Sequence, residues 1–193
     1  MAHKFSPQKI ERLLAEDRLG DTTPAELLKE NGLGEGMVFA DIGCGPGFFD
    51  GPAAEVVGPA GVVYAVDTQQ EMLDELEKRV DSPNIIPVRS EENHIPIDDR
   101  CVDFVLLAYV LHEAESKPVF LKEVRRIMKD GGRVLLIDWE KKVEDKGPPL
   151  EERVSCEEAA GLLEGAGFVM EKVSSLNPSH YILKAKKGPE GPR

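Results

Sequence analysis

Three glycines and two carboxylates form the most regular pattern of potentially functional residues in this chain. Asp41 is followed at every second position by Gly43, Gly45 and Gly47, and Asp67 comes twenty residues after Gly47. Glycine has no Cβ, so this stretch can turn tightly and let a ligand approach the backbone closely. A carboxylate such as Asp67 can accept hydrogen bonds from both hydroxyls of a ribose. The spacing therefore predicts a ribose-containing cofactor beside a glycine-rich turn.

Each of these features also has a purely structural interpretation. The glycines can simply form the turn between a strand and a helix, and Asp67 can cap a helix expected over residues 69–80. Thr68 is also available for that cap, which would leave the Asp67 carboxylate for a ligand. A dinucleotide fingerprint needs the pattern Gly-x-Gly-x-x-Gly, and its third glycine position is Phe48 here. NAD is therefore a poorer fit to this turn.

Alternating strands and helices must position these residues. Apolar runs predict strands at 37–42, 62–66, 85–89, 102–108 and 133–138, and helical patterns cover 24–30, 48–57, 69–80 and 117–129. Such alternation predicts an α/β fold with a doubly wound, mostly parallel sheet. Ligands bind such sheets at the carboxyl ends of the strands, where the glycine turn and Asp67 fall.

The end of the chain departs from this alternation. Ser155 should cap a further helix that stops near residues 165–167. The two strands expected at 168–173 and 180–185 are joined only by residues 174–179, which is too short for a crossover helix. They should therefore pair antiparallel and complete a seven-stranded sheet with a C-terminal hairpin. Upstream, Gly131-Gly132 should stop the helix over 117–129 and turn the chain into strand 133–138.

The Asp41-x-Gly43-x-Gly45-x-Gly47 stretch, paired with Asp67, resembles the first motif of class I S-adenosylmethionine-dependent methyltransferases. The antiparallel end of the sheet is similar to the Rossmann-like fold of that family. The resemblance covers roughly residues 35–187 and implies that the chain is an enzyme with S-adenosylmethionine as its cofactor. A length of 193 residues fits one domain over 1–187, with 1–34 as an N-terminal helical cap segment and 188–193 as a disordered tail.

The resemblance also implies which residues contact the cofactor. The glycine turn would pass beside its methionine portion, Asp67 would hold the ribose, Glu91 the adenine amino group, and the Glu92 N–H a ring nitrogen. The same loop could instead be acidic only for solubility. The full set of expected cofactor-binding residues is Asp41, Gly43, Cys44, Gly45, Gly47, Asp67, Thr68, Glu91, Glu92 and Ala108.

The strand over 102–108 ends where the methyl acceptor should meet the cofactor. The Asn/Asp-Pro-Pro-aromatic motif of many nucleic-acid and protein methyltransferases is absent here, and the segment is similar to small-molecule enzymes of the ubiquinone/menaquinone type. The resemblance therefore implies a small-molecule acceptor. His112 is the candidate general base, because its unperturbed pKa lies near neutrality; alternatively it only organises a helical turn. The expected substrate pocket comprises Tyr109, His112, Asp138 and Trp139.

Composition narrows the remaining functional classes. A net charge of −12 argues against nucleic acid as a partner, and the longest apolar run, eight residues, is too short to span a membrane. Cys44, Cys101 and Cys156 show neither disulfide nor metal-ligand spacing, which favours a reducing cytoplasm. Three thiols also keep arsenite methylation as an alternative. A non-catalytic cofactor-binding regulator is another alternative, and either a monomer or a homodimer is compatible.

The first 23 residues form an amphipathic and irregular segment. Ile10, Leu13 and Leu14 share one helical face, and Gly20-Asp21 breaks the pattern. Two placements follow from this apolar face. The segment either packs over the cofactor cleft as a small lid or covers one edge of the sheet.

Overall fold

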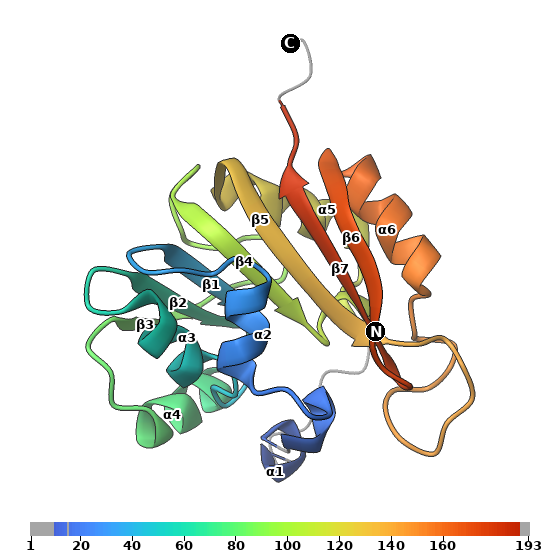
Figure 1. The fold of residues 1–193 in the computed structure, drawn as a ribbon, viewed down its shortest axis with the longest axis horizontal. Coiled ribbons are helices and arrows are strands. Elements are labelled where there is room, and N and C mark those ends of the chain that lie inside the picture. Colours follow the sequence, from blue (N-terminus) through green and yellow to red (C-terminus); the bar gives the residue numbers. More distant parts are fainter. Residues whose placement is uncertain (1–9, 15, 190–193) are drawn as a thin grey trace.

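A computed structural model describes residues 10–14 and 16–189 of the chain (Figure 1). Its centre is a seven-stranded sheet in the order β3-β2-β1-β4-β5-β7-β6, in which only β7 runs antiparallel to its neighbours. The prediction of a doubly wound, mostly parallel sheet with a C-terminal antiparallel hairpin is therefore confirmed. The strands are β1 (Val38–Ile42), β2 (Val62–Asp67), β3 (Ile85–Arg89), β4 (Val102–Ala108), β5 (Met128–Trp139), β6 (Phe168–Asn177) and β7 (His180–Lys187).

Helices cover both faces of this sheet, because the strands are apolar on both sides. One face packs against α2 (Pro24–Glu30) and α3 (Asp50–Val57), and Phe39 and Phe104 belong to that core cluster. The opposite face packs against α5 (Lys117–Ile127) and α6 (Cys156–Gly165). The helix α4 (Gln70–Arg79) lies against β2 and β3. Short elements complete the chain: α1 (Ile10–Leu13), and the 3-10 helices η2 (Glu16–Leu19) and η3 (Leu111–Glu113).

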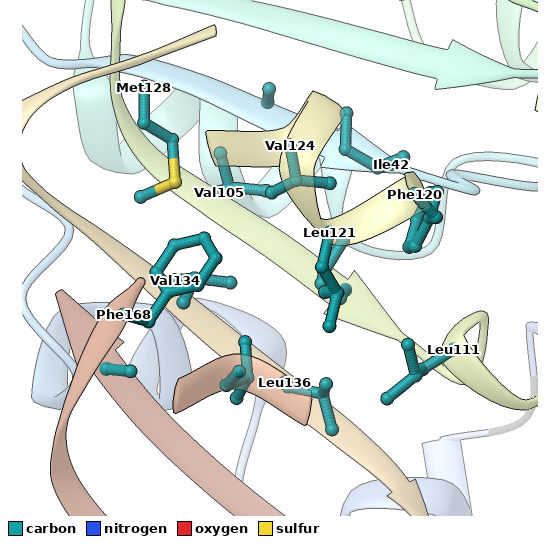
Figure 2. Packing of buried hydrophobic residues seen from close by; sticks show 14 of the residues in the cluster. Ile42, Val105, Leu111, Phe120, Leu121, Val124, Met128, Val134, Leu136 and Phe168 are labelled. Atoms are coloured by element: carbon teal, nitrogen blue, oxygen red, sulfur yellow. The ribbon is translucent and has the colours of Figure 1, made fainter. Parts of the chain in front are cut away.

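The larger apolar core lies between the sheet and α5 and α6. Figure 2 shows Leu121 and Val124 of α5 against Val105 of β4, with Phe168 of β6 beside Val134 of β5. These side chains are almost completely removed from water, and each such burial stabilises the fold by about 1.5–3 kcal/mol. This core fixes the strand ends that carry the functional residues.

Two helices begin where the sequence predicts, α2 at Pro24 and α6 directly after Ser155. The Thr23 hydroxyl accepts a hydrogen bond from the Glu26 N–H, and the Glu26 carboxylate accepts one from the Thr23 N–H, which forms a complete capping box with Pro24 in the first turn. Ser155 caps α6 through the Glu158 N–H. Both predicted helix starts are therefore confirmed.

The Gly131-Gly132 prediction is wrong. The helix α5 ends at Ile127, and β5 begins at once with Met128 paired to Val102. Gly131 adopts a φ of 75°, and a Cβ on Gly132 would lie 2.9 Å from the Lys129 carbonyl oxygen. The two glycines thus form an irregular bend inside β5, where the register with β4 shifts, and they do not terminate a helix.

The C-terminal hairpin is tighter than predicted. The strand β6 continues to Asn177, so residues 174–177 lie in a strand and only Pro178 and Ser179 connect it to β7. The Asn177 side-chain oxygen accepts a hydrogen bond from the Ser179 N–H, which stabilises this turn.

Two further expectations, at Thr68 and in the C-terminal tail, need correction. Other expectations concern residues that the structure does not describe. Thr68 does not cap α4, whose N-cap residue is Gln69. Gly188 is not part of a loose tail, because its N–H donates to the Gly167 carbonyl and its carbonyl accepts from Arg125. Residues 1–9 of the expected cap segment and 190–193 of the expected tail lie outside the described residues.

Candidate functional site

A cleft that is open to solvent lies at the carboxyl ends of β1, β2 and β4. The glycine turn after β1 and the loop after β3 form two of its walls. Leu13 of α1 and Arg18 of η2 also line it, so the N-terminal segment packs over this cleft, as one of the two predicted placements has it. Figure 1 shows α1 beyond the end of the sheet toward which β4 points.

The glycine turn has two different functions along its length. Gly43 and Gly45 line the cleft at φ values of 78° and 56°, and a Cβ on Gly43 would lie only 2.8 Å from a Val110 methyl. Gly47 also has positive φ, but it does not line the cleft among the described residues; a Cβ there would lie 3.0 Å from Leu76 of α4. The first two glycines therefore shape the cleft, and the third allows α4 to pack closely.

Asp67 ties the glycine turn to the start of α4. One oxygen of its carboxylate accepts a hydrogen bond from the Gly45 N–H at 2.9 Å, and the other accepts one from the Gln69 N–H at 2.8 Å. The residue is only 8% exposed but lines the cleft. A carboxylate has about four acceptor positions and can accept hydrogen bonds from ligand hydroxyls as well as from backbone N–H groups.

Two buried acids lie near Asp67 and change the electrostatics of the cleft. Asp41 lines the cleft, and burial together with the charge of Asp67 raises the pKa of Asp41 to about 8. Asp50, in the first turn of α3, is completely buried, and burial raises its pKa well above its usual range. Neither carboxyl has a hydrogen-bond partner among the described residues. A cation in the cleft would favour ionisation of Asp41.

The loop after β3 forms the far wall of the cleft. Glu91 and His94 pair their backbones in a tight turn, and both Glu91 and Glu92 line the cleft. The Glu92 carboxylate accepts a hydrogen bond from the Glu115 N–H at 2.6 Å. Met72 and Ile95 give this end an apolar floor. Polar groups beside an apolar floor suit a ligand that is a flat ring with polar edges.

His112 and Asp138 form a buried pair beside the cleft. The His112 Nδ1 lies 2.8 Å from the Asp138 carboxylate, which also accepts hydrogen bonds from the His112 and Trp139 N–H groups. Burial alone would lower the pKa of His112, but the hydrogen bond and charge of Asp138 outweigh it and raise that pKa. Among the described residues, neither side chain lines the cleft. The pair joins η3, which follows β4, to the end of β5.

Aromatic rings gather between this pair and the cleft. The Tyr109 ring lies 6.1 Å from Trp139 and 5.0 Å from His180 between centroids, and Trp139 lies 4.3 Å from His180. Tyr109 lines the cleft and adopts a φ of 61°, which is strained for a side chain of this size. His180 is buried, both its ring nitrogens lack a hydrogen-bond partner among the described residues, and burial lowers its pKa to about 4. The neutral imidazole therefore belongs to the aromatic wall.

Most residues expected to bind a cofactor converge on the cleft. Those that line it are Asp41, Gly43, Cys44, Gly45, Asp67, Thr68, Glu91, Glu92, Ala108 and, from the expected substrate pocket, Tyr109. Gly47, His112, Asp138 and Trp139 lie behind its walls. Sequence reasoning missed Arg18, Asp50 and His180, because their positions depend on contacts between distant segments. The apolar face around Leu13 was the one signal that pointed to the N-terminal wall.

Two features are absent from the part of the chain that the structure describes. No helix in residues 10–14 and 16–189 is long and apolar enough to cross a membrane. In the same part of the chain, no group of three or more His, Cys, Asp or Glu side chains is arranged to hold a metal ion.

Comparison with known proteins places the chain in a family. Residues 40–136 match a family described as "Methyltransferase domain". A S-adenosylmethionine-dependent methyltransferase from Aquifex aeolicus is 38% identical, with 95% of this chain and 100% of that chain covered and a TM-score of 0.90. Another from Mesorhizobium loti is 16% identical, covers 87% of this chain and 99% of that chain with a TM-score of 0.71, and shows the fold alone.

A curated relative adds a more distant similarity. The demethylmenaquinone methyltransferase of Staphylococcus aureus is 29% identical over 113 residues, which cover 58% of this chain and 47% of that enzyme. The chain thus spans about half the length of this relative. Its match to a transposon protein of Streptomyces fradiae covers 30% of that protein's length. The family match over half of the chain and the 38% identity over nearly all of it carry the conclusion. This chain belongs to the S-adenosylmethionine-dependent methyltransferases.

Proposed function

We propose that this protein binds S-adenosylmethionine in the cleft and transfers its methyl group to a small organic acceptor held near Tyr109. The observation that carries the proposal is the convergence of the glycine turn, Asp67 and the loop after β3 on one cleft. In this arrangement Gly43 and Gly45 contact the methionine portion, the Asp67 carboxylate binds the ribose, and Glu91 binds the adenine amino group. The Glu92 N–H pairs with a ring nitrogen, and Asp41, Cys44, Thr68 and Ala108 complete the wall.

The proposed reaction is an in-line displacement at the sulfonium methyl. The cofactor supplies an activated methyl group whose leaving group is a neutral thioether, so the protein mainly has to align the acceptor with the methyl carbon. Orientation of two bound reactants can contribute about 7–11 kcal/mol to lowering the barrier. The strained backbone of Tyr109 and the close packing of the Val110 side chain on Gly43 would keep this end of the cleft rigid.

An aromatic acceptor fits the residues around Tyr109 best. The rings of Tyr109, Trp139 and His180 form one side of this region, and aromatic rings pack favourably against such walls. The name of the Staphylococcus aureus relative gives demethylmenaquinone as its substrate. His112 stays a predicted general base; its position behind the wall favours a role in holding the segment after β4.

Arsenite methylation is less well supported. Arsenic would need thiolate ligands, whereas burial raises the pKa of Cys44, Cys101 and Cys156 and so keeps all three thiols protonated near neutral pH. Cys44 follows β1, Cys101 precedes β4 and Cys156 begins α6, so the three come from separate elements.

The test is a methyl-transfer assay with labelled S-adenosylmethionine and a panel of small phenols, quinols and amines. We expect S-adenosylhomocysteine and a labelled product in equal amounts with at least one aromatic acceptor. A matched panel with arsenite and a reducing thiol tests the alternative. Cofactor binding without turnover on any acceptor would contradict the proposed reaction and favour a regulatory role.

A further inference from the structure

The loop after β5, residues 140–148, is folded around the side chain of Arg153 and is called the β5 loop below. The Arg153 side chain is only 2% exposed, and a buried charge is stable only where hydrogen bonds and an opposite charge replace the water it has lost. Its guanidinium donates to the Glu144 carboxylate at 2.9 Å. It also donates to four backbone carbonyls of the loop, those of Glu140, Lys142, Lys146 and Pro148. One buried cation therefore fixes the β5 loop along most of its length.

Arg153 also holds Trp139, the last residue of β5 and the only tryptophan of the chain. The guanidinium carbon lies 5.1 Å from the Trp139 ring centroid, within the range of a cation–π interaction. Gly147 packs against both groups at a φ of 89°, and a Cβ there would lie 2.8 Å from Trp139 Cε3 and 2.9 Å from Arg153 Nη2. The lack of a side chain at Gly147 thus allows the β5 loop to close on Trp139 and Arg153 together.

The Glu144 carboxylate connects the β5 loop to the turn between β6 and β7, which lies beside the loop in Figure 1. One carboxylate oxygen accepts a hydrogen bond from the Ser179 hydroxyl at 2.7 Å, and the other accepts the bond from Arg153. The hydrogen bonds from Ser179 and Arg153 lower the pKa of Glu144 to about 2, so this group is ionised near neutral pH. His180 follows Ser179 and pairs with Trp139 across β5 and β7. The loop and the turn are therefore joined next to the Trp139–His180 pair.

The Trp139–His180 pair supports Tyr109, which lines the cleft. The Tyr109 ring centroid lies 6.1 Å from that of Trp139 and 5.0 Å from that of His180. The backbone of Tyr109 has a φ of 61°, and a strained conformation persists only where the surrounding packing holds it. A shift of Trp139 would therefore change the position of the Tyr109 ring in the cleft.

We propose that Arg153 is a positioning residue for the methyl acceptor: it holds the β5 loop closed on Trp139, and Trp139 holds the Tyr109 ring against an aromatic acceptor. The inference rests on the proposed function, which places the acceptor near Tyr109. Arg153 is not among the described residues that line the cleft, so it acts through Trp139 and touches neither reactant. Its loss should weaken the binding of an aromatic acceptor and leave the binding of S-adenosylmethionine unchanged.

Two substitutions disturb this arrangement in different ways. Gly147→Ala places a methyl group against Trp139 and Arg153 without removing a charge. Its control is Gly36→Ala: Gly36 has a φ of 73°, and no described atom beyond its chain neighbours lies within 4 Å of an added Cβ. Both substitutions carry the cost of a side chain at positive φ, and only Gly147→Ala displaces the β5 loop. Arg153→Lys keeps the charge but lacks the planar fork of donors that holds several carbonyls at once.

Fluorescence of Trp139 measures the closure of the β5 loop directly, because no other tryptophan contributes to the signal. Acrylamide should quench the unchanged chain and Gly36→Ala equally. Gly147→Ala and Arg153→Lys should be quenched at least about twofold more strongly, because local opening exposes the indole ring. Equal quenching of all four proteins would show that the loop does not hold Trp139, and the inference would be wrong.

Calorimetry then separates acceptor binding from cofactor binding. The acceptor probe is 1-naphthol, an aromatic alcohol, titrated into each protein in the presence of S-adenosylhomocysteine. Gly147→Ala and Arg153→Lys should bind this probe about 3- to 10-fold more weakly than the unchanged chain, the scale of a lost aromatic contact. Their affinity for S-adenosylmethionine should stay within about twofold of the unchanged chain, as should both affinities of Gly36→Ala.

The other outcomes contradict the inference in distinguishable ways. If the variants expose Trp139 but bind 1-naphthol as the unchanged chain does, Arg153 has only a structural role. Equal losses for 1-naphthol and S-adenosylmethionine would mean a general loosening of the fold. If the unchanged chain binds S-adenosylmethionine but not 1-naphthol, the Tyr109 wall does not hold an aromatic acceptor. If it does not bind S-adenosylmethionine, the proposed function fails and the inference fails with it. Thermal melts check that each variant is folded, and Gly147→Ala carries the test if Arg153→Lys does not fold.

Discussion

Replacement of Asp67 by alanine should destabilise the protein as well as weaken cofactor binding. The carboxylate accepts two backbone hydrogen bonds that connect the glycine turn to α4, and the residue is almost fully buried. Alanine would leave the Gly45 and Gln69 N–H groups without these acceptors. Loss of a hydrogen bond to a charged group costs about 1.5–3 kcal/mol.

The net loss is smaller than twice that figure, because Asp67 also repels Asp41. The charge of Asp67 is one cause of the raised pKa of Asp41, and its removal relieves that repulsion. We therefore expect Asp67→Ala to lower the free energy of unfolding by about 2–4 kcal/mol. For a chain of this length, each kcal/mol lowers the melting temperature by about 2–4 °C.

Urea unfolding at pH 7 measures this loss, with Asp67→Asn and Asp74→Ala as comparison variants. Asparagine keeps one acceptor oxygen and should lose roughly half as much stability as alanine. Asp74 is an exposed acid on α4 that bonds only the Gln70 side chain in the described structure, so its loss should cost less than about 0.5 kcal/mol. If Asp67→Ala proves as stable as Asp74→Ala, the carboxylate does not hold the turn.

Three buried ionisable groups near the cleft give pH-dependent predictions. Because the pKa of Asp41 is about 8, binding of the cationic cofactor should release a proton, and calorimetry in buffers of different ionisation enthalpy should show affinity rising from about pH 6.5 to 8.5. The folded pKa of Asp50 lies well above its unfolded pKa, so its contribution to stability is lost as the pH rises. Unfolding curves should show Asp50→Asn gaining stability relative to the unchanged chain as the pH rises above the unfolded carboxyl pKa of about 4, and a constant difference would contradict this. The pKa of His112 is raised in the folded protein, so the residue stabilises the fold most at pH values below its unfolded pKa. His112→Gln should therefore lower the free energy of unfolding by about 1–3 kcal/mol at pH 6 and by less at pH 9, with cofactor affinity unchanged. A hundredfold loss of turnover at constant stability would instead establish His112 as a general base.

Local sequence signals predicted the frame of the site well. The strand before the glycine turn, the Thr23-Pro24 helix start and the antiparallel hairpin follow from short-range rules on caps, glycine and loop length. The error at Gly131-Gly132 has a physical origin. A glycine pair permits positive φ in either a turn or a strand bend, and only pairing with β4 decides between them.

Features that depend on tertiary contacts could not be read from the sequence. Arg18 meets Tyr109 across 91 positions of the chain, and no periodic pattern encodes that contact. Asp50 looks like an ordinary acid in the first turn of a helix, yet the fold buries it beside Asp41. Gly47 matches the motif in sequence but packs against Leu76, because a repeat of glycines does not tell which of them faces the ligand.

Titration of the purified chain with S-adenosylmethionine, with NAD as control, tests the central claim most directly. The cleft described above predicts saturable binding of one S-adenosylmethionine per chain, competition by S-adenosylhomocysteine, and no saturable binding of NAD. Binding of NAD in place of S-adenosylmethionine would contradict this account of the glycine turn and of Asp67.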